Sequence, residues 1–140
     1  MTGPLSPSSP VAPLERLCAS TELVEKGRAI VFDVLRFREP ARAFAMRFDG
    51  VVVAYLNRCV HVPTELDWQP GEFLDADRRF ILCSIHGAAY EPRNGRCIGG
   101  PCGQGRLTLL ETCELEGDVW WRPTRDTKPA PAAPQGSPSQ

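Results

Sequence analysis

The sequence of 140 residues predicts a small all-β domain, folded as an antiparallel sandwich or barrel. Its apolar residues gather in short runs that match the length of strands, and no segment has a long helical period. Turn signals separate these runs roughly every ten residues, which is the spacing of hairpins and not of parallel strands joined by crossover helices. We therefore expect paired strands in a meander.

Six runs are expected to form strands, and one segment is expected to form a short helical turn. The helical turn is expected within Ser20 to Lys26, because Ser20 is a possible N-cap and Gly27 a helix stop. Turns are indicated at Asp49-Gly50, Asn94-Gly95 and Glu116-Gly117-Asp118. The expected strands are Ala29 to Phe37, Ala43 to Phe48, Val51 to Leu56, Arg79 to Leu82, Arg106 to Leu110 and Val119 to Trp121.

The two ends of the chain are expected to be disordered tails around one domain. Residues 1–13 are rich in proline and serine, and residues 124–140 are rich in proline and alanine. Neither end can bury enough apolar surface to fold. We therefore expect one domain over residues 14–123.

The composition argues against nucleic acid and membrane partners. The formal net charge is -1, with dispersed basic and acidic residues that provide no electrostatic footprint for nucleic acid or an anionic membrane. No apolar run is long enough for membrane insertion. The N-terminus shows neither the basic start nor the apolar stretch of a signal peptide, so a cytoplasmic protein is expected.

The cysteines and histidines indicate a metal site. Six cysteines could build a disulfide framework, but without an export signal thiolate chemistry with a metal is the better expectation. Each of the two histidines closely follows a cysteine, in Cys59-Val60-His61 and in Cys83-Ser84-Ile85-His86, and each pair follows an expected strand. We therefore predict that Cys59, His61, Cys83 and His86 bind metal.

Zinc and iron are both possible from the ligand types. Two cysteines and two histidines suit tetrahedral zinc, but zinc sites typically use a pair of cysteines and a separate pair of histidines. Here each pair mixes the two types. Mixed pairs on two loops let one iron take both thiolates and a second iron take both imidazoles, which favours a two-iron cluster.

These motifs resemble the binding loops of the Rieske [2Fe-2S] family. The two Cys/His motifs, the second followed by Gly87, look like its two ligand loops. Asn94-Gly95-Arg96 followed by Gly99-Gly100-Pro101 is similar to its third loop, in which a Gly-Pro segment folds over the cluster. The resemblance covers roughly residues 14–122.

The resemblance implies one [2Fe-2S] cluster per chain, held in a subdomain over about residues 57–105 that is inserted in a β framework. It implies that Cys59 and Cys83 bind the inner iron and that His61 and His86 bind the outer iron near the surface. Electrons would then enter and leave through the histidines.

The chain departs from the Rieske subunits of quinol-oxidising respiratory complexes. It has Thr64 and Ile85 where those subunits carry an extra pair of disulfide-bonded cysteines, and Ala88 where they place a serine that donates to a cluster sulfur. Tyr90 remains at the position of a second donor. Because fewer hydrogen bonds stabilise the reduced cluster less, we predict a potential below the respiratory type, within the Rieske range of about −150 to +300 mV.

The sequence leaves open whether Cys97 and Cys102 form a disulfide. They flank the Gly-Gly-Pro segment, and a turn between them could bring their sulfurs within bonding distance. Two reduced thiols are the favoured alternative, because disulfides are rare in cytosolic proteins.

The function expected from the sequence is transfer of single electrons by a ferredoxin-like protein, between a reductase and a terminal acceptor such as an oxygenase. We expect an electron-transfer component and not a catalyst, because both histidines are committed as ligands and no other nucleophile arrangement remains. The alternatives are a zinc-stabilised or redox-sensing binding module and a small subunit of a reductase.

Overall fold

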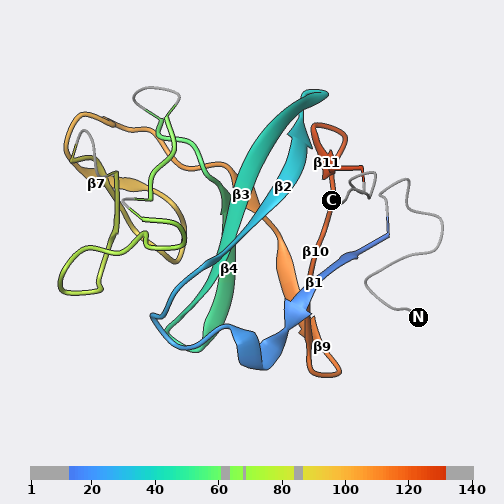
Figure 1. Cartoon of the computed structure of the whole chain (residues 1–140). Coiled ribbons are helices and arrows are strands. Elements are labelled where there is room, and N and C mark those ends of the chain that lie inside the picture. Colours follow the sequence, from blue (N-terminus) through green and yellow to red (C-terminus); the bar gives the residue numbers. More distant parts are fainter. Residues whose placement is uncertain (1–12, 61–63, 68, 84–86, 132–140) are drawn as a thin grey trace.

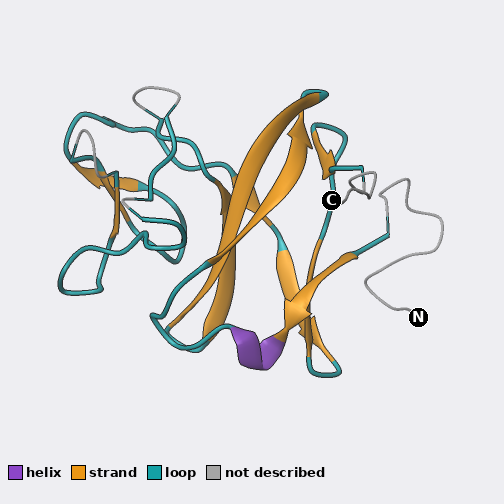
Figure 2. Ribbon diagram, viewed as in Figure 1, coloured by secondary structure: helices purple, strands orange, loops and turns teal. Residues whose placement is uncertain are grey.

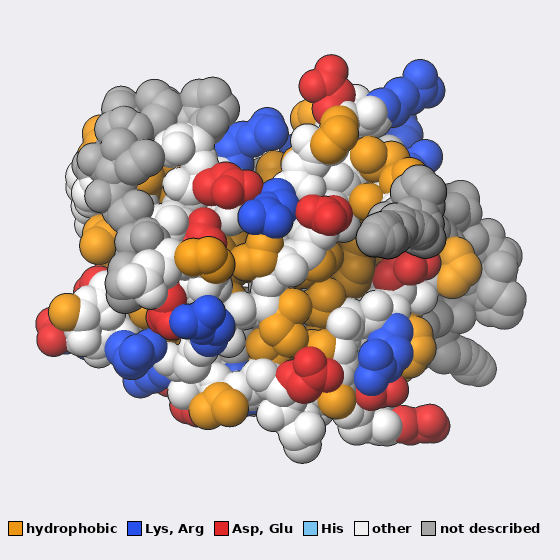
Figure 3. All heavy atoms as spheres, in the orientation of Figure 1, with side chains coloured by type: hydrophobic (Ala, Val, Ile, Leu, Met, Phe, Trp, Pro, Cys, Tyr) orange, Lys and Arg blue, Asp and Glu red, His pale blue; other side chains and the backbone are white. Residues whose placement is uncertain are grey.

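The computed structural model describes residues 13–60, 64–67, 69–83 and 87–131. Within these ranges the chain forms three antiparallel sheets and one short 3-10 turn, so the predicted all-β fold is confirmed (Figures 1 and 2). In the part of the chain that is described, no helix is long and apolar enough to cross a bilayer. Basic and acidic side chains are interspersed over the face seen in Figure 3.

The framework consists of two of the three sheets. The five-stranded sheet has the order β11-β2-β3-β4-β8, and the first three-stranded sheet has the order β1-β10-β9. The strands of the larger sheet are β2 (Ile30–Arg36), β3 (Glu39–Phe48), β4 (Val51–Leu56), β8 (Leu109–Leu110) and β11 (Thr127–Pro129). Those of the smaller sheet are β1 (Glu15–Ala19), β9 (Thr112–Leu115) and β10 (Asp118–Trp121).

The third sheet belongs to a segment inserted between β4 and β8. Its order is β5-β6-β7, with β5 at Ile81–Leu82, β6 at Ala89–Tyr90 and β7 at Cys97–Gly99. In Figure 1 this segment lies on one side of β3 and β4, and β1, β9 and β10 lie on the other side. The insertion therefore has its own small sheet and rests against the framework.

Strand β3 is buried on both faces because a separate core packs against each. Its alternate residues Phe44 and Met46 lie in the core shared with the inserted segment. Ala43 and Ala45 lie in the core shared with β1 and β10. Side chains of a strand alternate between faces, so a continuous apolar run is what two cores require.

The Asp49-Gly50 turn forms as the sequence predicts. Phe48 pairs with Val51, which leaves a loop of two residues, and both loop residues have positive φ, 55° at Asp49 and 80° at Gly50. Such backbone twist matches that of the flanking strands, which is why an Asp-Gly pair is favoured in hairpins of this length.

The helical segment is shorter than predicted. The structure has one 3-10 turn at Ser20–Glu22, whose N-cap is Ala19 and not Ser20. The Glu22 carboxylate, and not the Ser20 hydroxyl, accepts a hydrogen bond from the Ala19 N–H at 2.9 Å. Leu23 is already extended, so the helix ends before Lys26.

Strand β11 lies inside the segment that was expected to be disordered from residue 124 onward. It pairs with β2, and the side chain of Thr127 is buried and accepts a hydrogen bond from Arg36 Nη1 at 2.8 Å. The Phe37 N–H also donates to the Asp126 carbonyl at 2.8 Å. A proline-rich segment can join a sheet here because β11 is an edge strand, where Pro129 needs no second partner.

Candidate metal centre

The first predicted ligand loop leaves the end of β4 and is closed by its own backbone. The Cys59 N–H donates to the Thr64 carbonyl at 2.8 Å. The buried Asn57 side chain accepts from the Leu66 N–H at 2.8 Å and donates to Asp67 at 3.1 Å. Asn57 therefore fastens the two ends of the loop that carries Cys59, a role that the sequence did not reveal.

The second predicted ligand loop is the turn of the β5–β6 hairpin. Leu82 pairs with Ala89, and the next residues, Cys83 and Ala88, continue the pairing through a 2.8 Å bond from the Cys83 N–H to the Ala88 carbonyl. The Gly87 N–H donates to the Cys83 carbonyl at 2.9 Å. A short hairpin therefore fixes the position of Cys83 at the base of its loop.

Both predicted cysteine ligands lie deep in the structure. The exposed fraction is 2% for Cys59 and 0% for Cys83, and both belong to the core that the inserted segment shares with β3 and β4. The two histidine ligands predicted from sequence, His61 and His86, lie outside the described residues.

Tyr90 is the polar residue that lies nearest the predicted cysteine ligands. Its hydroxyl oxygen is 3.5 Å from Cys59 Sγ and accepts a hydrogen bond from the Val60 N–H at 3.1 Å. Burial raises the pKa of Tyr90 far above its ordinary value, and the hydrogen bond with Cys59 and the charge of Cys83 act in the same direction. Tyr90 therefore stays protonated, and its O–H can donate to the Cys59 sulfur.

The third loop follows β7 and packs against both ligand loops. A Cβ atom placed on Gly100 would lie 2.6 Å from the Gly87 carbonyl oxygen and 2.8 Å from Ala88 Cα, and Gly100 has a φ of +84°. A Cβ atom on Gly105 would overlap the side chain of Val60. These close approaches require glycine, so the loop covers the ligand loops as the resemblance implied.

A disulfide closes the third loop. It joins Cys97 and Cys102, whose Cα atoms are 5.8 Å apart. Of the two alternatives left open by the sequence, the structure forms the one that the expected cytosolic location disfavoured. The reason is local, since the Gly105 N–H donates to the Cys102 carbonyl and the Cys97 N–H donates to the Gly105 carbonyl, both at 2.9 Å, which folds the loop back on itself.

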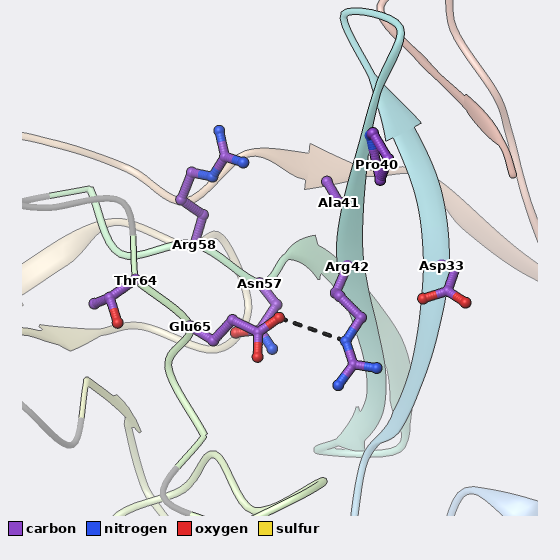
Figure 4. Close-up of a pocket in the computed structure, with 8 residues that line it drawn as sticks. All are labelled: Asp33, Pro40, Ala41, Arg42, Asn57, Arg58, Thr64 and Glu65. Atoms are coloured by element: carbon purple, nitrogen blue, oxygen red, sulfur yellow. Dashed lines mark hydrogen bonds and ion pairs between the residues drawn. The ribbon is translucent and has the colours of Figure 1, made fainter.

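A cavity of about 330 Å³ lies between the first ligand loop and the β2–β3 hairpin. Figure 4 shows Arg42 on β3 reaching toward Glu65 across this cavity, with Nε and Oε2 3.4 Å apart. Arg58 projects away from this pair. The cavity is lined by Asp33, Pro40, Ala41, Arg42, Asn57, Arg58, Thr64 and Glu65.

The described residues fit a metal cluster bound by two thiolates. Cys59 and Cys83 are excluded from water, each sits at a loop fixed by backbone hydrogen bonds, and a tyrosine hydroxyl lies beside one sulfur. Such surroundings favour buried thiolate ligands, because the hydrogen bond and the metal charge compensate the cost of desolvating sulfur.

The family model for the Rieske [2Fe-2S] domain matches residues 14–114. This chain belongs to the Rieske family. The Rieske domain binds a [2Fe-2S] cluster, which agrees with the cofactor predicted from the sequence. No curated protein matches the chain.

Solved structures with the same fold include components of carbazole 1,9a-dioxygenase. The ferredoxin from Nocardioides aromaticivorans IC177 has a TM-score of 0.64 and 20% identity, and the match covers 81% of this Rieske chain and 100% of the ferredoxin. The terminal oxygenase from the same organism has a TM-score of 0.62 and 18% identity, over 77% of this chain and 29% of the oxygenase. A chain from a complex of reduced oxygenase and oxidised ferredoxin has a TM-score of 0.60 and 21% identity, over 78% of this chain and 92% of that one.

Proposed function

We propose that this Rieske protein is a ferredoxin-like carrier that takes single electrons from a reductase and passes them to an oxygenase or another terminal acceptor. The observation that carries the proposal is its extent. The match covers the whole of the carbazole dioxygenase ferredoxin but 29% of the terminal oxygenase. The chain spans less than a third of the oxygenases it matches, so the identity of its acceptor is part of the proposal.

We propose further that Cys59, His61, Cys83 and His86 hold the cluster. The burial of both cysteines supports thiolate ligation of the inner iron. The spacing of the two motifs supports imidazole ligation of the outer iron. When bound, the cluster supplies a centre that accepts and releases one electron.

The protein's own residues would hold that centre dry and rigid. Asn57 and the β5–β6 hairpin fix the loops, and Tyr90 directs its hydroxyl to the Cys59 sulfur. Ala88 offers no hydroxyl at the position where respiratory subunits have a serine. Because Tyr90 is then the one side-chain hydroxyl inferred to donate to sulfur, a potential below the respiratory type is expected.

The experiment that tests the proposal is a redox titration of the purified protein followed by EPR. A Rieske carrier should be red-brown, should titrate reversibly with a one-electron slope, and should give the low average g-value of a histidine-ligated cluster. A colourless protein that contains zinc would contradict the proposal and favour a zinc-stabilised module. Co-purification with a reductase in constant ratio would instead favour a reductase subunit.

The ligand assignment has its own test. Replacing His61 or His86 by cysteine exchanges a neutral ligand for an anionic one, which favours the oxidised state and should lower the potential. The average g-value should rise at the same time, since one nitrogen ligand is lost. A variant whose spectrum and potential match those of the wild type would exclude that histidine as a ligand.

We also propose that the protein works in the cytoplasm, as its sequence predicts. Fractionation of the native host with antibodies against the chain would test this, and recovery with a membrane or extracellular fraction would contradict it.

A further inference from the structure

We propose that Cys97 and Cys102 form a second redox site, a dithiol–disulfide pair whose oxidised form fastens the third loop over the two ligand loops. This site is chemically separate from the cluster, because it exchanges two electrons and two protons with a dithiol. The inference goes beyond electron transfer and does not depend on the identity of the redox partner.

The position of the disulfide is the first observation. It spans the Gly-Gly-Pro segment, so it restrains the backbone that contacts the ligand loops. Gly100, inside the ring that the disulfide closes, packs on Gly87 and Ala88 of the second ligand loop. Gly105, next to that ring, packs on Val60 of the first.

The surroundings of the two sulfurs accommodate both redox states. The Gly99 carbonyl oxygen lies 3.5 Å from Cys97 Sγ and 3.3 Å from Cys102 Sγ, and the Ala89 carbonyl oxygen lies 3.9 Å from Cys102 Sγ. After reduction these oxygens can accept hydrogen bonds from the new S–H groups. The reduced pair can therefore remain in place and close again on oxidation.

Access differs between the two cysteines, which sets the order of the exchange. Cys97 is partly exposed, whereas Cys102 is 7% exposed and packs in the core with Cys59 and Cys83. A thiolate from a dithiol reductant attacks Cys97 Sγ, the S–S bond breaks, and Cys102 leaves as a thiolate that takes up a proton. The second thiol of the reductant then attacks its own sulfur in the mixed disulfide, which releases Cys97 and yields oxidised reductant.

The consequence concerns the ligand loops. With the S–S bond broken, the third loop keeps its backbone hydrogen bonds but loses the covalent restraint across the segment that covers those loops. Local opening of this segment should become more frequent, and the ligand loops should be exposed to solvent and chelators more often.

The chain offers a direct readout of the thiol state. Trypsin cleaves after Arg96 and after Arg106, so one peptide, residues 97–106, contains Cys97 and Cys102 and no other cysteine. Holoprotein purified without reductant is quenched with an alkylating agent, digested and weighed, before and after incubation with dithiothreitol. We expect no label before reduction and two labels afterwards.

The second readout is cluster loss. The decay of the visible absorbance in excess chelator is compared between oxidised wild type, wild type incubated with dithiothreitol, and the Cys97→Ser/Cys102→Ser variant. We expect several-fold faster decay in the reduced protein and in the double variant, with no effect of dithiothreitol on the double variant. Cys113→Ser, on β9 of the other sheet, is the matched control and should decay like the wild type in both conditions.

Three results would overturn the proposal. Two labels on the peptide before any reductant is added would exclude the disulfide. A peptide that stays unlabelled after reduction would exclude a reducible site. Equal decay rates in oxidised and reduced wild type, or an equal effect of dithiothreitol on the double variant, would exclude control of the third loop by the disulfide.

Discussion

At the scale of single residues, the chemistry of the site depends on what surrounds the cysteine sulfurs. Tyr90 is fully buried, and its hydroxyl accepts from the Val60 N–H. The Val60 N–H occupies the acceptor side of the oxygen, so the Tyr90 hydrogen is left to point at Cys59 Sγ, 3.5 Å away. Hydrogen bonds to the sulfurs stabilise the more negative, reduced state of a cluster.

Tyr90→Phe should therefore lower the reduction potential. A hydrogen bond contributes about 1 kcal/mol net, which for a one-electron couple corresponds to a decrease of up to roughly 40 mV. Redox titration followed by visible circular dichroism measures the change.

Tyr55→Phe is the matched control for this substitution. Tyr55 is equally buried, but its hydroxyl donates to the Pro92 carbonyl at 2.6 Å. Its loss should lower the unfolding free energy by about 1 kcal/mol and leave the potential unchanged. Equal potentials in Tyr90→Phe and wild type would show that Tyr90 does not donate to a cluster ligand.

At the scale of elements, sequence reasoning located the long strands and the ligand loops but missed the short strands. The run Val51 to Leu56 is apolar throughout and matches β4 residue for residue. Strands β6 and β7 have two and three residues, which is too short for a periodic pattern, and they exist because hairpin pairing holds them. Hydrophobic periodicity cannot reveal strands that are set by tertiary pairing.

The site shows the same division. The cysteines were predicted because spacing along the chain identifies them. Asn57 was missed because its partners, Leu66 and Asp67, are set by the path of the loop, and an asparagine before a cysteine has many other roles. The Asn57 clamp and the disulfide needed the three-dimensional structure.

The third loop provides a prediction about backbone packing. Gly100→Ala places a methyl group against the Gly87 carbonyl at a position where φ is +84°, so it should destabilise the protein by at least about 1 kcal/mol and accelerate cluster loss. The neighbouring Gly99 has nothing within 4 Å of an added Cβ, and Gly99→Ala should behave like the wild type in both measurements. Similar chelator-induced decay in the two variants would contradict close packing of this loop.

The β3–β4 turn provides a prediction about pH. The Glu25 carboxylate accepts from the Asp49 N–H at 2.6 Å and the Gly50 N–H at 2.8 Å, and the bond from Gly50 is the main cause that lowers the pKa of Glu25 below its ordinary value of 4.5. Because the folded pKa is lowered, this stabilisation is present above pH 4.5 and is lost as the pH falls through the folded value.

Glu25→Gln should therefore have a lower melting temperature than the wild type at neutral pH, and the difference should shrink as the solution becomes acidic. Thermal unfolding between pH 7 and about pH 3 measures it. A difference that stays constant over this interval would show that the carboxylate charge does not hold the turn.

At the scale of the whole molecule, one sheet serves two cores. The framework core between the five-stranded and three-stranded sheets contains Val34, Val119 and Trp121, and the other core contains the predicted cysteine ligands. Arg47 on β3 ties the two sheets together through a paired contact with Glu114 on β9, at 2.9 and 3.0 Å. Anything that stabilises the framework should therefore support the ligand loops through β3 and β4.

The C-terminal edge of the framework separates the tail expected from the sequence from the strand that the structure contains. A chain ending at Pro123 lacks β11, its pairing with β2 and the Arg36–Thr127 hydrogen bond. With several hydrogen bonds lost, each of about 1 kcal/mol net, the unfolding free energy should fall by at least about 2 kcal/mol. Urea denaturation of the holoprotein measures this decrease, and a second chain ending at Pro131 keeps β11 and should match the full-length protein. If both truncated chains unfold at the same urea concentration as the full chain, residues 124–131 contribute nothing to the fold and the domain ends at residue 123, as composition alone predicts.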